Sequence, residues 1–455
     1  MTAGSGTARH LGELLLSALA AVSWAFLAMV GVAALSLHLM GADDVGSLGP
    51  MTAAAVVLAV GGTVEPSGDL QIFGLQGAEA TSAVDIAPLG ISLVGALLLG
   101  WFFLRSLRGA GPVIDRGELA ARAGAVLLLF LLILGGLCWV GNDTVTIDGS
   151  ALGLGDIGQL GDLAGLGAGQ LPGALADLAN ANARVGFSVR TGRSLLGGTV
   201  WVLAVLLIAL LASRRTPLPR GWEAVHRVVR PAFSALCAVL VLAVGAGIAA
   251  ALYAAIGDNH PGLVIGSALL GAPNGVWLGV SLGLFVPWHG QATGALRQVL
   301  PDPVDQLLGA QEEERITIAR LAELDSRVWL LAVASVLMML AAGVLLAVRT
   351  PVPPGAAGGR GPGPYGFAGR CALRLGVATA LVLPLLVWLT GLSAGASLSV
   401  LGFDAFGATL DLHGSVPFAV LLGAGWGAAG GFVGALPAWT TGTAGGQVSP
   451  FARAG

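Results

Sequence analysis

Long apolar runs, separated by short blocks of arginine, set the strongest limit on what this chain can fold into. Charged residues make up only 10% of the chain, and a charged side chain costs about 2.5–3.5 kcal/mol at the centre of a membrane-spanning helix. A helix of about 20 apolar residues crosses a hydrocarbon core of roughly 30 Å. We therefore predict an all-α polytopic membrane protein with eight transmembrane helices in four hairpins, at residues 14–39, 86–104, 119–141, 195–213, 232–256, 328–348, 372–391 and 416–437.

The distribution of charge predicts how these helices are oriented. Cytoplasmic loops of membrane proteins are enriched in arginine and lysine. With eight spans and both termini in the cytoplasm, the cytoplasmic side holds fifteen arginines and four acidic residues, and the other side holds seven arginines and 21 acidic residues. The predicted location is therefore the cell membrane, with multiple passes. Lysine is absent, and the cytoplasmic arginines collect in three blocks: Arg105, Arg108, Arg116 and Arg122; Arg214, Arg215, Arg220, Arg227 and Arg230; Arg349, Arg360, Arg370 and Arg374.

Two further apolar stretches, 50–62 and 262–287, are predicted to be re-entrant segments that enter and leave the membrane from the outer side. The first is too short to cross comfortably. If the second crossed, the arginine block from Arg349 to Arg374 would move to the outside, against the charge rule. Eight spans are therefore preferred, with nine or ten as the alternative.

A turn signal interrupts the second stretch at Gly271-Ala272-Pro273-Asn274-Gly275. Proline presets φ, and asparagine and glycine tolerate positive φ, so this segment is predicted to join two half-helices. Irregular backbone at membrane depth is tolerated where it is buried in protein or lines a wet cavity. Gly271, Pro273, Asn274 and Gly275 are thus the candidate residues of a pathway or re-entrant turn. A turn that is simply packed inside the protein is an equally good alternative.

The connections on the outer side are long and contain strand-like segments. The loop 142–194 has a Gly/Leu-rich tract and a short predicted helix at 174–183, and the loop 288–327 is acidic. On the cytoplasmic side, the linker 349–370 is rich in proline and glycine and is expected to be flexible. The predicted strand-like segments are 144–147, 185–189, 316–318, 397–400 and 409–412.

Internal similarities suggest two four-span halves in parallel orientation, 1–215 and 216–455. Parallel repeats occur in transporter folds. The alternative is that such short matches arise by chance in a chain so rich in alanine, glycine and leucine. Small residues also predict close helix packing at Gly423, Gly425, Gly427, Ala428, Gly430 and Gly431. Each outer loop ends in a similar triplet before the chain re-enters: Val84-Asp85-Ile86, Phe187-Ser188-Val189, Ile316-Thr317-Ile318 and Leu410-Asp411-Leu412.

The polar residues offer little catalytic chemistry. Asp85, His260 and Asp411 are the polar candidates at the outer face, but each lies near a helix end, where a water-facing cap explains it. No two histidines have metal-ligand spacing, and only a cluster of His260, His289 and His413 would suggest a metal enzyme. No nucleotide-binding or hydrolase motif is present, and no basic face suited to nucleic acid. We predict no enzyme activity, no cofactor and no nucleic-acid partner.

The whole chain resembles the streptophobe family, which consists of very hydrophobic actinobacterial membrane proteins. The resemblance lies in the arginine-only, Ala/Gly-rich spans and in the stretch from Leu270 to Trp288. It implies an integral membrane protein of unknown biochemical activity. Two functions stay open. One is a permease-like or channel-like translocation component built around the re-entrant segments. The other is a non-catalytic scaffold in the lipid bilayer whose acidic outer loops bind another membrane or extracytoplasmic protein.

Overall fold

The structure is a computed structural model that describes residues 3–44, 46–69, 78–109, 114–147, 183–217, 219, 221–222, 224–293, 314–352, 363–400 and 403–453. Residues 174–182 of the helix predicted at 174–183 and residues 353–362 of the linker 349–370 lie outside these residues.

Nine helices in the described part are long and apolar enough to cross a membrane. The ninth, which was not counted among the predicted spans, is α9 (Pro261–Gly283). The stretch 50–62 forms a shorter helix, α2 (Leu48–Ala59). The protein is therefore a helical membrane protein. The eight helices that coincide with predicted spans are α1 (Ala3–Leu39), α3 (Leu89–Gly109), α4 (Arg116–Val140), α7 (Thr191–Ala212), α8 (Arg230–Ala255), α13 (Trp329–Arg349), α14 (Pro364–Thr390) and α15 (Val416–Thr440).

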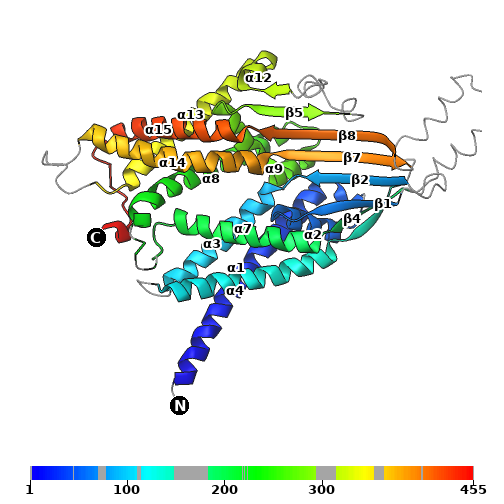
Figure 1. Cartoon of the computed structure of the whole chain (residues 1–455), viewed down its shortest axis with the longest axis horizontal. Helices are drawn as coiled ribbons and strands as arrows, with labels where there is room; N and C mark the ends of the chain where they lie inside the picture. The colour runs from blue at the N-terminus through cyan, green and yellow to red at the C-terminus, as the bar shows by residue number, and fades with distance from the viewer. Residues whose placement is uncertain are drawn as a thin grey trace, which may run out of the picture.

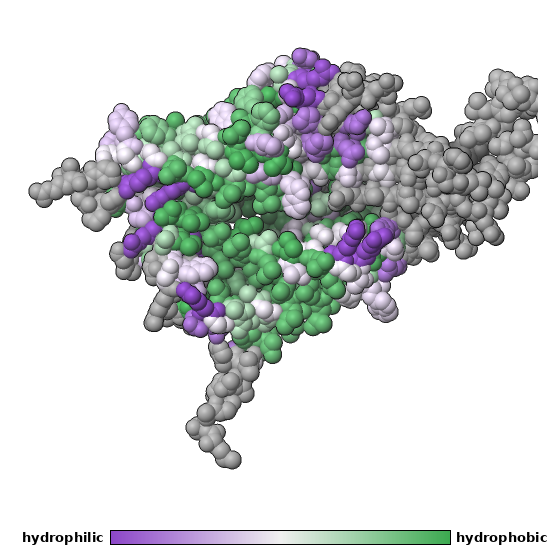
Figure 2. Space-filling view, viewed as in Figure 1, coloured by the Kyte–Doolittle hydropathy of each residue, from purple (hydrophilic) through white to green (hydrophobic). Residues whose placement is uncertain are grey.

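A broad apolar belt covers the helices, and hydrophilic residues gather at its two ends (Figure 2). Large apolar side chains on the helices, such as Leu132, Leu242 and Leu421, are exposed in the isolated chain. Extended apolar surfaces of this kind mark contact with a membrane or a partner. The belt therefore agrees with a bundle surrounded by lipid.

The strands form one antiparallel sheet at one end of the bundle (Figure 1), here called the sheet end. Four of the five predicted strand-like segments, 144–147, 185–189, 397–400 and 409–412, lie in strands, whereas only Ile316 of 316–318 does, because a helix begins at Ile318. The union of the strands in a single sheet was not predicted. The C-terminal helix α16 (Pro450–Arg453) lies at the opposite end of the molecule (Figure 1). The strands are β1 (Val64–Asp69), β2 (Ala78–Asp85), β3 (Asp143–Ile147), β4 (Ala183–Val189), β5 (Trp288–Ala292), β6 (Glu314–Ile316), β7 (Leu392–Val400) and β8 (Phe403–Gly414).

The order of elements repeats along the chain. The series α1–α2–β1–β2–α3–α4–β3–β4–α7 is followed by α8–α9–β5–β6–α13–α14–β7–β8–α15. Among the described elements, only short helices such as α12 (Ile318–Leu324) and the 3₁₀ turn η4 (Ser326–Val328) depart from this order. The sheet repeats the same way, because its order is β3-β4-β1-β2 and then β7-β8-β5-β6. β2 pairs with β7 over eight residues, from Ala78↔Val400 to Asp85↔Ser393, and joins the two series.

Each series of helices surrounds its own core. The first core is aromatic: the ring centroids of Phe26 and Phe130 lie 4.6 Å apart, and those of Phe130 and Trp201 lie 5.4 Å apart. The second core brings helix backbones together at glycines. A Cβ atom added at Gly430 would lie 2.7 Å from the carbonyl oxygen of Met339. The predicted close packing is confirmed for Gly423, Gly427, Gly430 and Gly431, whereas Gly425 faces open space.

Candidate functional site

The predicted turn at residues 271–275 is not present. Gly271, Pro273, Asn274 and Gly275 lie within the continuous helix α9, and Pro273 is buried there. A proline inside a helix removes one hydrogen bond and crowds the preceding turn, but neighbouring helices let membrane proteins tolerate it. The prediction of two half-helices was therefore wrong, because tertiary packing overrides the local turn signal.

Asn274 connects α9 to the beginning of α3. Its side-chain Nδ2 donates to the carbonyl oxygen of Ala87 at 2.9 Å, and its Oδ1 accepts from the backbone N–H of Leu89 at 3.1 Å. Leu89 is the first residue of α3, and the first N–H groups of a helix have no partner within the helix. Asn274 thus acts as a cap supplied by another helix, and its amide is engaged at both ends.

Both ends of α9 pack against helices close to the sheet end of the bundle. A Cβ added at Gly262 would lie 2.9 Å from the carbonyl oxygen of Leu39, the last residue of α1. A Cβ added at Gly283 would lie 2.7 Å from the carbonyl oxygen of Leu331, the third residue of α13. Since α1 belongs to the first series and α13 to the second, α9 lies against both halves of the bundle.

The part of the sheet formed by β5 and β8 has two different faces. Trp288 is 1% exposed and packs with Leu410 and Leu412 in the second core. The residues between them point the other way, as strand geometry requires. We call this opposite surface the polar sheet face, and it consists of His289, Gln291, Thr293, Thr409, Asp411 and His413.

The outer candidates Asp85 and Asp411 are brought into one row of the sheet. Asp85 on β2 pairs with Ser393 on β7, and Ser393 pairs with Asp411 on β8. Asp411 in turn pairs with Gln291 on β5. Two strand spacings separate the two aspartates, or about 10 Å. Of this row, Gln291 and Asp411 belong to the polar sheet face, and the Ser393 side chain is exposed.

The histidines come together only in part. His289 and His413 pair across β5 and β8, and their rings stack with centroids 5.6 Å apart. His260 lies elsewhere, before the first residue of α9, and its backbone N–H donates to the Asp258 carboxylate at 2.7 Å. Among the described residues, no group of three or more histidine, cysteine, aspartate or glutamate side chains could hold a metal ion.

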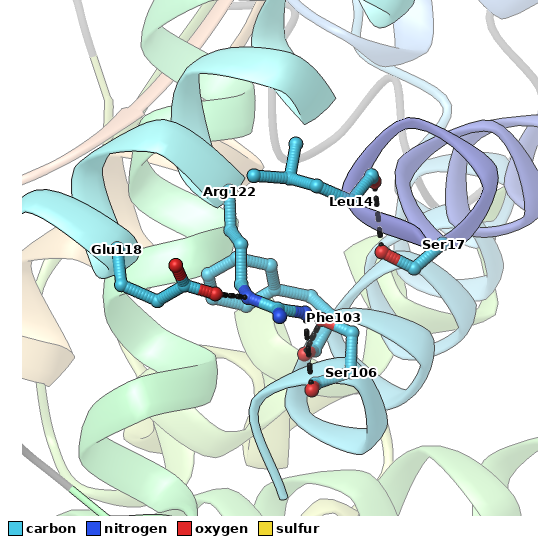
Figure 3. Close-up of polar contacts among 6 residues, drawn as sticks. All are labelled: Leu14, Ser17, Phe103, Ser106, Glu118 and Arg122. Atoms are coloured by element: carbon cyan, nitrogen blue, oxygen red, sulfur yellow. Dashed lines mark hydrogen bonds and ion pairs between the residues drawn. The ribbon is translucent and has the colours of Figure 1, made fainter. Parts of the chain in front are cut away.

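At the end of the bundle away from the sheet, an ion pair within α4 of the first half involves an arginine that also hydrogen-bonds to α3. Arg122 donates from Nε to Oε1 of Glu118 at 2.7 Å and from Nη1 to the carbonyl oxygen of Ser106 at 3.1 Å (Figure 3). The Ser106 hydroxyl donates to the carbonyl oxygen of Phe103 at 2.8 Å. The Arg122 side chain is 10% exposed and that of Glu118 is 20% exposed, so a mostly buried positive charge has its compensating negative charge beside it.

The polar sheet face was not predicted, although the sequence carries a signal for it. Apolar and polar residues alternate with period two from Trp288 to Ala292 and from Leu410 to His413, which is typical of half-buried strands. No family model, no curated protein and no solved structure matches this chain. The function must therefore be argued from the geometry alone.

Proposed function

We propose that the protein is a non-catalytic membrane scaffold that presents its sheet to a protein partner on the extracytoplasmic side. The observation that carries the proposal is the two-faced sheet: Trp288 fixes one face to the helical core, and the opposite face exposes Asp411 and His413. A sheet anchored in this way is rigid relative to the membrane, which lowers the entropic cost of binding.

The proposal includes eight membrane crossings with both termini in the cytoplasm. Both ends of α9 contact helices near the sheet end, at Leu39 and Leu331. The contact at Leu331 is only about 3 Å along α13 from its first residue, at 1.5 Å per residue. A helix that crossed would bring its second end to the far side, so these contacts favour an α9 that stays in the outer part of the membrane. α2 has 12 residues, or about 18 Å, which is too short to cross.

This topology keeps all three arginine blocks on the cytoplasmic side, in accord with the charge rule. A channel-like or permease-like role has less support. It depended on irregular backbone around Asn274, and Asn274 instead lies in a helix with its amide bonded to the start of α3.

The proposed partner carries basic residues on its binding surface. Acidic residues outnumber arginines in the strands, where only Arg184 and Arg315 are positively charged. Complementary charge steers association and weakens as salt screens it. The acidic residues of the strands are Glu65, Asp69, Glu79, Asp85, Asp143, Glu314, Asp404 and Asp411.

Site-specific photocrosslinking tests the scaffold role. A photoreactive residue at Thr409 or Asp411, both exposed on the sheet, is expected to give one discrete protein adduct in native membranes. The adduct should weaken as salt is raised. The control position is Leu242, which is 73% exposed on α8 and should give lipid adducts. Equal protein adducts at all three positions, or none at the two sheet positions, would contradict the proposal.

Cysteine labelling tests the topology separately. Ser267 is exposed on α9, and the three native cysteines can be replaced first. We expect Ser267→Cys and Thr409→Cys to react with a membrane-impermeant reagent from the outside, and Arg215→Cys to react only after permeabilisation. Labelling of Thr409→Cys and Arg215→Cys from the same side would require α9 to cross.

A further inference from the structure

Besides Arg230, whose side chain also donates to two carbonyl oxygens, three arginines at the end of the second half away from the sheet have buried donor atoms without partners. They are Nε of Arg349, Nη2 of Arg370 and Nη1 of Arg374, each with less than 1 Å² of accessible surface and no hydrogen bond. A buried donor left without an acceptor destabilises the folded state, and the penalty is larger when the donor is charged. Three such atoms at one end of a bundle indicate that a negatively charged group belongs there.

The surrounding contacts place the three arginines at one junction of helices. Arg349, the last residue of α13, donates from Nη1 to the Ser234 hydroxyl on α8 at 3.2 Å. Its neighbour Thr350 interacts with the Cys371 thiol on α14. Cys371 lies between Arg370 and Arg374, and both of these arginines act on it electrostatically. The end of α13 and the starts of α14 and α8 therefore meet here.

A fourth arginine adds to the positive charge. Arg214 lies within electrostatic range of Arg349, and its Nη1 donates to the carbonyl oxygen of Gln447 at 3.1 Å. Burial lowers the pKa of Arg214, and the positive charge of Arg215 lowers it further. Like charges are thus crowded at this junction.

Within the described residues, no carboxylate lies within ion-pair distance of Arg214, Arg349, Arg370 or Arg374. In the first half, the corresponding positive charge is compensated by a carboxylate. Arg122, the seventh residue of α4, is paired with Glu118, whereas Arg370, the seventh residue of α14, has no such partner. The second half is therefore built to receive its negative charge from outside the protein.

We propose that Arg349, Arg370 and Arg374 form a binding site for a phosphate group. Guanidinium groups bind phosphate through paired, charge-assisted hydrogen bonds, and a tetrahedral phosphate has enough oxygens to accept from all three side chains. The site lies at a helix end, where two sources can supply this chemistry: the headgroup of an anionic phospholipid and a free phosphate ion or ester.

The test uses the full chain purified in detergent and compares it with Arg374→Gln. Thermal unfolding is measured with phosphatidylglycerol in mixed micelles, with phosphatidylcholine, and with sodium phosphate against sodium chloride at equal ionic strength. A ligand that binds only the folded state raises the unfolding temperature. Loss of one charged hydrogen-bonding group should weaken the apparent affinity by at least about tenfold. Phosphate also stabilises proteins non-specifically, so the readout is the difference between wild type and variant.

The two sources give different results. Stabilisation of wild type by phosphatidylglycerol alone, lost in Arg374→Gln, identifies a lipid headgroup. Saturable stabilisation by sodium phosphate, also lost in the variant, identifies a free ion. Arg215→Gln is the matched control, because Arg215 is exposed in the same end of the bundle and should leave either response unchanged.

The proposal is overturned if neither ligand stabilises wild type beyond Arg374→Gln, or if Arg215→Gln removes the response equally. If Arg374→Gln does not fold, Arg370→Gln supplies the same comparison. Arg374→Lys adds a further distinction, since it keeps the charge but loses the planar donor pair. It should bind more weakly than wild type, and equal binding would overturn the assignment of a specific site.

Discussion

The two halves of the bundle repeat one order of elements but fill it with side chains of very different size. At the fifteenth residue of three matched pairs of helices, the side chain in the first half is larger than the one in the second half. The pairs are Phe103 in α3 and Gly343 in α13, Phe130 in α4 and Ala378 in α14, and Val205 in α7 and Gly430 in α15. One architecture can therefore be stabilised either by interlocking aromatic rings or by contact between helix backbones.

The difference extends to charge. The first half neutralises the mostly buried Arg122 with its own Glu118, and the second half leaves donor atoms of Arg370 and Arg374 without a partner. One feature is held in common: the eleventh residues of α7 and α15 are Trp201 and Trp426, and both donate from the indole Nε1. The shared architecture therefore constrains the order of helices and strands more tightly than it constrains the size of core side chains or the compensation of buried charge.

The largest expected effect comes from adding volume to the second half. Gly430→Leu would force a side chain against the backbone of Met339, which neither helix can move away from cheaply. We expect no folded, monodisperse protein by size-exclusion chromatography in detergent. Gly425→Leu is the control on the same helix, because Gly425 faces open space. A folded Gly430→Leu variant with an unchanged unfolding temperature would show that the backbone contact is unimportant.

Removal of volume should instead damage the first half. Phe130 is fully buried between Phe26 and Trp201, so Phe130→Ala leaves a cavity and should lower the free energy of unfolding by about 3–5 kcal/mol. Denaturant unfolding in detergent measures this loss. Phe130→Leu, which keeps most of the volume, should lose clearly less; equal losses in the two variants would speak against a cavity.

A smaller effect is expected from making the first half resemble the second in charge. Glu118→Gln leaves the mostly buried Arg122 without its carboxylate and should lower the free energy of unfolding by about 1–3 kcal/mol. The exposed Glu13→Gln, also near the far end of the bundle, should change little. If the two variants have the same free energy of unfolding, the pairing of Arg122 with Glu118 does not stabilise the first half.

The smallest effect concerns the connection between the halves. Asn274→Ala removes two hydrogen bonds to the backbone around α3 and should cost about 1–2 kcal/mol. Because α9 belongs to the second half and α3 to the first, the two halves should also unfold less cooperatively, as a broader thermal transition. Ser267→Ala, an exposed position on α9, is the control. A sharp, unshifted transition in Asn274→Ala would show that these two hydrogen bonds do not couple the unfolding of the two halves.

The sequence predicts well what depends on local composition. Hydrophobicity located eight of the long helices, and strand-like segments such as 144–147 and 185–189 form β3 and β4. The sequence predicts poorly where contacts between residues far apart in the chain determine the structure. The turn signal at Pro273 and Asn274 is overridden by packing against α1, α3 and α13, and no local pattern could reveal that β2 pairs with β7 more than 300 residues away.

The candidate site was predictable in part. Asp85 and Asp411 were singled out one by one, but their common row follows from strand register, which a non-local pairing sets. The absence of acidic residues near Arg370 and Arg374 was visible in the sequence. The sequence alone does not show, however, that donor atoms of these arginines are buried away from water and have no hydrogen-bond partner.

The pairing of β2 with β7 has a consequence for assembly. Units that join head to tail leave two unlike free edges, and such a series grows without limit unless one edge is made unsuitable. β2 offers eight residues to β7, whereas in the part of the chain that the structure describes its counterpart β6 spans three, from Glu314 to Ile316, and is followed by α12. A strand this short offers too few backbone hydrogen bonds to pair stably with a third unit. The sheet thus resembles a head-to-tail assembly that stops after two units.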